Sequence, residues 1–94
     1  MSDRRTVEIV VEGRVQGVGY RDWTQRRAVA LGLSGSVRNR ADGTVAAIVS
    51  GPADAVAAMI DACKSGPGAA RVDGVSVTER GGEPVPDGFA ILHG

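Results

Sequence analysis

The chain has 94 residues, of which 43% are hydrophobic, enough for one small domain with a single modest core. Eleven basic residues balance eleven acidic ones, which argues against a dedicated nucleic-acid-binding protein. The single cysteine excludes an internal disulfide, and no apolar run approaches the roughly 20 residues of a membrane span. We therefore expect one domain over residues 1–94, in a monomeric cytoplasmic protein that does not bind membranes.

The first predicted element is a strand over residues 6–12. Val7, Ile9 and Val11 alternate with Glu8 and Glu12, which is typical of a strand with one buried face. A short glycine-rich loop follows, and a helix over residues 21–31 comes next. Gly32 is a plausible C-cap for that helix.

The loop between this strand and helix combines features that suit a phosphate group. Three glycines, Gly13, Gly17 and Gly19, allow positive φ angles and bring backbone N–H groups close to a ligand. The N-terminus of the following helix adds free N–H groups, and Arg21 adds a permanent cation. The sequence here predicts a phosphate-binding loop, and the alternative is a plain connection with a solvated arginine. No Gly-Lys-Ser/Thr follows, and the third glycine of a dinucleotide fingerprint is absent.

Residues 36–40 and 44–50 are predicted to form a hairpin around Asp42-Gly43. Gly51-Pro52 then opens a second helix that ends near Ser65, with Cys63 on its apolar face, where we expect a buried thiol. A fourth strand covers residues 71–79, with Gly74 a possible bulge. A polar loop over 80–88 leads to a short closing strand over 89–92.

This order of elements predicts an α+β fold. It is the ferredoxin-like βαββαβ arrangement, an antiparallel sheet with two helices on one face, plus a short C-terminal strand. In that topology the first two strands run parallel, so the glycine-rich loop and the end of the second strand emerge at the same end of the sheet.

Alternation along the second strand places Asn39 with Val37 on the helix-facing side, next to the loop. Asn39 either belongs to a site there or caps the Asp42-Gly43 turn. Arg38 and Arg40 face the other side, where we expect them to be solvated or paired with Glu8 and Glu12. Trp23 either forms part of a pocket rim or is simply half-buried.

Two segments resemble the acylphosphatase family. Residues 13–21, GRVQGVGYR, are similar to the family pattern Gly-x-Val-Gln-Gly-Val-x-Phe-Arg, with Tyr20 in place of Phe. Residues 35–45, GSVRNRADGTV, resemble Gly-Trp-Val-Arg-Asn-x-x-Asp-Gly-x-Val, with Ser36 in place of Trp. Ala46 stands where the pattern often has an acidic residue. The resemblance implies the same ferredoxin-like fold.

The resemblance also implies an activity, the hydrolysis of acyl phosphates to a carboxylate and inorganic phosphate. It assigns orientation of the attacking water to Asn39. It assigns phosphate binding to Arg21 and to the backbone N–H groups of Val15, Gln16, Gly17, Val18, Gly19 and Tyr20. It calls for no metal or cofactor, and we expect the penultimate residue, His93, to be an ordinary surface residue.

Two other functions remain open. One is a non-catalytic module that binds phosphate or acyl phosphate through the same loop. The other is a single-stranded RNA binder, since RNA-recognition modules share this topology. The RNA interpretation is weak, because such modules stack bases on aromatic strand residues, and Phe89 is the only one expected here. Residues 1–40 carry a net charge of +4 and the remainder −4, which would steer a small anion unless folding scatters these charges evenly.

Overall fold

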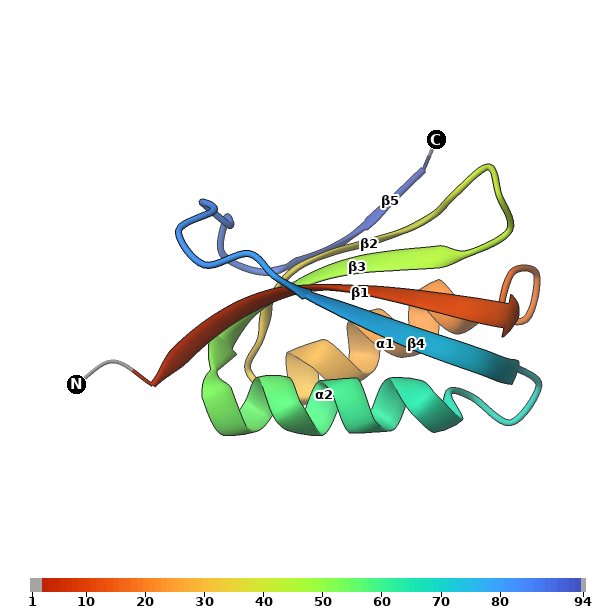
Figure 1. Cartoon of the computed structure of the whole chain (residues 1–94), viewed down its shortest axis with the longest axis horizontal. Helices are drawn as coiled ribbons and strands as arrows, with labels where there is room; N and C mark the ends of the chain where they lie inside the picture. Colours follow the sequence, from red (N-terminus) through yellow and green to blue (C-terminus); the bar gives the residue numbers. More distant parts are fainter. Residues whose placement is uncertain (1–2, 94) are drawn as a thin grey trace.

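The computed structural model describes residues 3–93, which form a twisted sheet with two helices packed on one of its faces (Figure 1). The elements in chain order are β1 (Arg4–Arg14), α1 (Tyr20–Ala30), β2 (Ser34–Asn39), β3 (Val45–Pro52), α2 (Ala53–Ser65), β4 (Arg71–Glu79) and β5 (Phe89–Leu92).

The sheet has the strand order β4-β1-β3-β2-β5. Pairing is antiparallel between β1 and β3, β1 and β4, and β2 and β3, which confirms the predicted ferredoxin-like arrangement of four strands. The closing strand β5 adds to the free edge of β2 and runs parallel to it, so the complete sheet is mixed. The sequence predicted the strand β5 but not its pairing with β2.

The core lies between the sheet and the helices. Val7, Ile9 and Val11 of β1 are fully buried, as their alternation predicted. The helices contribute every third or fourth residue, the spacing of one helix face, with Tyr20, Thr24 and Ala28 from α1 and Val56, Met59 and Cys63 from α2. Each large apolar side chain buried here stabilises the fold by about 1.5–3 kcal/mol. Cys63 is a buried free thiol, as expected.

Local features of the chain explain where elements bend or end. Gly32 has a φ of 72° and follows the last turn of α1, the conformation that makes glycine favourable after a helix. The ladder between β1 and β4 shifts register at Glu12/Gly13, beside Gly74, close to the predicted bulge. No helix of the described residues is both long and apolar enough to cross a membrane.

Candidate active site

One end of the sheet brings together the loop after β1, the last residue of β2 and the last residues of β5 (Figure 1). A hollow of about 210 Å³ lies between them. The glycine-rich loop and the end of β2 therefore lie side by side, as the topology predicted. The residues lining this hollow are Val15, Gly17, Gly19, Tyr20, Arg21, Asp22, Asn39, Ile91 and His93.

The backbone of the loop has the conformation that its glycines predicted. Gly17 and Gly19 have φ angles of 74° and 80°, in the left-handed region that other residues rarely adopt. Gly19 is the N-cap of α1, and no side chain caps this helix end. The N–H groups of the first turn therefore remain available to an anion, and the helix dipole adds a partial positive charge there.

Arg21 is held at the edge of the hollow by the end of β5. Its Nη1 donates to the carbonyl oxygen of Leu92 at 3.2 Å and lies 3.3 Å from Nδ1 of His93. Because a guanidinium only donates, Nδ1 accepts and the proton of a neutral His93 ring belongs on Nε2. The remaining N–H groups of Arg21 form no hydrogen bond with the described residues, so they can bind a phosphoryl oxygen.

Asn39 is the last residue of β2 and pairs with Val45 of β3. Its side chain forms no hydrogen bond within residues 3–93, although it lines the hollow. The interpretation that it caps the hairpin turn is wrong, because Asp42 fills that role. Asp42 Oδ1 accepts hydrogen bonds from the backbone N and the Oγ1 of Thr44, at 3.0 and 2.6 Å. These bonds hold the pKa of Asp42 below its usual value.

The loop is tied to the hairpin by the side chain of Gln16, a contact that the sequence did not indicate. Gln16 Nε2 donates to the carbonyl oxygens of Arg40 at 2.8 Å and Thr44 at 2.9 Å. Arg40 and Thr44 also bond to each other across the turn, at 2.9 Å between N and O. Gln16 thus fixes the distance between the glycine-rich loop and the strand end that carries Asn39.

Gln16 and Val18 do not line the hollow, although the prediction for them concerns their backbone N–H groups. Trp23 does not line it either; it is half-buried, the second of its two interpretations, and packs against Tyr20 with ring centroids 5.3 Å apart. Of the two alternatives for Arg38 and Arg40, the structure shows the solvated one: both are exposed, and Glu8 pairs with Arg80 at 2.7 Å.

Three lining residues were not expected at the site: Asp22, Ile91 and His93. Asp22 is paired with Arg26, one turn along α1, at 3.3 Å. Ile91 and His93 lie at the hollow because β5 pairs with β2, and no local sequence signal predicts that pairing. Within residues 3–93, no group of three or more His, Cys, Asp or Glu side chains is placed to hold a metal ion.

A family model described as "Acylphosphatase" matches residues 7–91 of this chain. The chain belongs to the acylphosphatase family. An acylphosphatase from Azorhizobium caulinodans is 51% identical over 86 residues, covering 92% of each chain. The crystal structure of acylphosphatase from Bacillus subtilis superposes with a TM-score of 0.89 at 38% identity, covering 93% of this chain and 97% of that one. These findings confirm the resemblance and the fold predicted from the two motifs.

The same fold also occurs within a longer protein. Full-length HypF, in a crystal structure of its phosphate- and nucleotide-bound form, matches with a TM-score of 0.87 at 28% identity. The match covers 98% of this chain but 12% of that one. Within the acylphosphatase family pattern, the Tyr20 departure is accommodated, because its hydroxyl donates to the carbonyl oxygen of Cys63 at 2.7 Å.

Proposed function

We propose that this protein hydrolyses acyl phosphates, the mixed anhydrides of a carboxylic and a phosphoric acid, without a metal ion. The observation that carries the proposal is the shared hollow: Arg21 and Asn39 line it together with the loop glycines Gly17 and Gly19. The family membership of the chain supports the same reaction, because the relatives that match it are named acylphosphatases.

The phosphate is proposed to sit over the loop. Backbone N–H groups from Val15 to Tyr20 and the guanidinium of Arg21 would bind its oxygens, with the positive end of α1 beneath. The hollow of about 210 Å³ is smaller than the roughly 300–1,000 Å³ of drug-sized ligand sites. That size suits the phosphoryl group, the part that all acyl phosphates share.

Asn39 is proposed to orient the attacking water. Its amide has no structural partner in the described chain, so both its oxygen and its nitrogen are available for hydrogen bonding. The water attacks phosphorus, the bond from phosphorus to the acyl oxygen breaks, and the carboxylate leaves. Because an amide cannot act as a base, a phosphate oxygen takes the proton of the water. A carboxylate is a good leaving group, so positioning and charge stabilisation supply most of the catalysis.

Hydrolysis of benzoyl phosphate by the purified protein in excess EDTA tests this function. We expect turnover to persist in EDTA and Arg21→Ala to lower kcat/KM by at least about 100-fold, since a charged hydrogen-bond donor is lost. Arg27→Ala is the matched control, an exposed arginine of the same helix that lies over Trp23 and does not line the hollow, so we expect its loss to leave the rate unchanged.

The second candidate is a binding module that holds phosphate without turning over. It is kept because the fold forms only a small part of full-length HypF. Saturable binding of inorganic phosphate with no hydrolysis of benzoyl phosphate would favour it. A cytoplasmic location and a monomeric state remain predictions, and the latter is checked by sedimentation velocity.

A further inference from the structure

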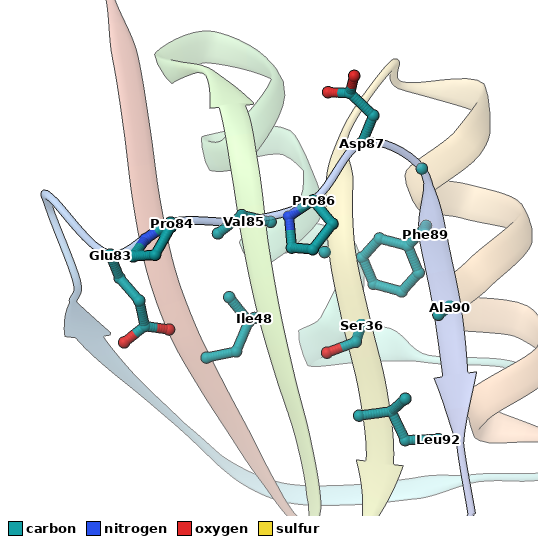
Figure 2. Close-up of a pocket in the computed structure, with 12 residues that line it drawn as sticks. Ser36, Ile48, Glu83, Pro84, Val85, Pro86, Asp87, Phe89, Ala90 and Leu92 are labelled. Atoms are coloured by element: carbon teal, nitrogen blue, oxygen red, sulfur yellow. The ribbon is translucent and has the colours of Figure 1, made fainter.

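A second hollow lies on the face of the sheet that points away from the helices (Figure 2). Its volume is about 540 Å³, against about 210 Å³ for the hollow beside Arg21, and the two share no lining residue. Its floor is formed by β3, β2 and β5. Its roof is the segment of residues 83–88, which crosses over these strands (Figure 2).

The floor is a shallow trough because its central side chains are small. Ser36 of β2 pairs with Ile48 of β3 on one side and with Ala90 of β5 on the other. One bulky side chain therefore borders two small ones, and the hydroxymethyl group of Ser36 leaves space above the sheet.

The roof is fixed at both ends and apolar between them. At one end Glu83 N donates to Arg80 O at 3.1 Å, and at the other Gly35 N donates to Gly88 O at 2.9 Å. Between these anchors, residues 84–87 form no hydrogen bond with the rest of the described chain. Pro84 and Pro86 have no N–H group at all. The underside of the roof thus presents proline rings and Val85 rather than backbone donors (Figure 2).

The charged residues that line this hollow are both acidic, and the neighbouring Arg80, which interacts with Glu83, is already ion-paired with Glu8 at 2.7 Å. Glu83 and Asp87 belong to its lining, one toward each end of the roof, and no basic residue does. In Figure 2 the side chain of Glu83 extends along the sheet beside Ile48, whereas that of Asp87 points away from the strands. Such an arrangement favours a cation over an anion, because complementary charge selects between ligands of equal shape.

We propose that this hollow binds a flat aromatic cation, with an indole-sized ring between Ser36 and the proline roof and an amino group toward Glu83. The volume of about 540 Å³ lies within the roughly 300–1,000 Å³ typical of small-molecule sites. The binding site is separate from the hollow at Arg21 and does not depend on the proposed function.

Titration of the ¹⁵N-labelled protein with tryptamine, followed by amide chemical shifts, tests the proposal directly. We expect saturable shifts at Ser36, Ile48, Val85 and Ala90, with Gly17 unmoved. Indole-3-acetate has the same ring and the opposite charge, and we expect it to bind about fivefold more weakly, the size of an exposed charge effect. Shifts that do not saturate, or that cluster away from the hollow, would overturn the proposal.

Two variants sharpen the test. Ser36→Trp fills the hollow with the protein's own indole and is expected to abolish tryptamine binding, whereas Thr78→Trp adds an indole on the exposed β4 and leaves binding intact. The double substitution Glu83→Gln and Asp87→Asn is expected to erase the preference for tryptamine over indole-3-acetate. Undiminished binding by Ser36→Trp would contradict the proposed position of the ring. If Ser36→Trp fails to fold, the chemical shifts of the wild type and the binding preference of the Glu83→Gln and Asp87→Asn variant still test the proposal.

Discussion

At the scale of single residues, Gln16 joins two segments that are distant in the sequence. Its backbone belongs to the glycine-rich loop after β1, while its amide nitrogen donates to carbonyl groups on both sides of the turn between β2 and β3. The geometry between the loop and Asn39 therefore depends on a side chain that does not itself line the hollow. This makes Gln16 a positioning residue for the proposed reaction.

Gln16→Leu keeps the size of the side chain and removes both hydrogen bonds. We expect the free energy of unfolding to fall by about 1–2 kcal/mol, since two hydrogen bonds are lost, one exposed and one partly buried, while each carbonyl keeps a backbone donor. We also expect kcat for benzoyl phosphate to fall by about tenfold or more, because small displacements of reacting groups are costly.

Gln25→Leu is the matched control. It removes one side-chain bond, from Gln25 Nε2 to Phe89 O at 2.8 Å, on the same helix as Arg21. We expect the Gln25→Leu protein to be less stable, with kcat within about twofold of the wild type, because neither Gln25 nor Phe89 lines the hollow. A normal kcat for Gln16→Leu would mean that the loop keeps its position without this link.

At the scale of secondary-structure elements, β2 packs so closely against β3 that one of its positions, Gly35, has no room for a side chain. Gly35 has a φ of 143°, and a Cβ built on it would overlap the carbonyl oxygen of Ile48 on the adjacent strand. Its N–H also anchors the end of the roof segment at Gly88. Gly35 is thus required both by its conformation and by the lack of space.

Gly35→Ala is expected to destabilise the protein by about 3 kcal/mol or more, because the strands must separate or the backbone must change. Gly82→Ala is the control, since Gly82 has a φ of 88° but open space around its Cα. There only the conformational strain of about 1–2 kcal/mol applies. Urea denaturation of both variants measures the difference, and equal losses would refute the role given to the contact with Ile48.

Local patterns in the sequence predicted most elements but not all of their pairings. Val7, Ile9 and Val11 fixed the buried face of β1, and Asp42-Gly43 marked the hairpin, because both signals act between near neighbours. The pairing of β5 with β2 joins residues 35–38 to residues 89–92 and has no local signal. As a result, the contact of Arg21 with Leu92 and His93 was missed, whereas Arg21 and Asn39 were predicted from motif and topology.

At the scale of the whole molecule, the two helices are linked through the core by Tyr20 and Cys63. The Tyr20 hydroxyl donates to the carbonyl oxygen of Cys63 at 2.7 Å, and both side chains are fully buried. Burial raises the pKa of Cys63 to about 11 and raises the pKa of Tyr20 well above its usual value. The folded state therefore keeps both groups neutral in alkaline solution.

Stability is expected to fall in alkali as a result. Above about pH 9 the unfolded chain begins to lose these protons while the folded chain keeps them. The unfolded state then binds fewer protons, and its free energy falls relative to that of the folded state. For Cys63 the loss runs from about pH 9 to about pH 11, and for Tyr20 it continues higher. The slope is at most about 1.4 kcal/mol per pH unit for each group.

Urea midpoints at pH 7, 9 and 10.5 measure this effect. Cys63→Ala gives the control, because it removes one of the two groups and should make the decline shallower. Midpoints that do not change between pH 9 and pH 10.5 would show that these groups titrate alike in both states.

The most direct test of the whole account is the pair of constants measured on Asn39→Ala: kcat for benzoyl phosphate and the inhibition constant of inorganic phosphate. If Asn39 orients the water while Arg21 and the loop hold the phosphate, kcat falls by on the order of 100-fold or more and phosphate inhibition stays nearly unchanged. An unchanged kcat, or a loss of phosphate binding equal to the loss of rate, would contradict the assignment of these roles within the hollow.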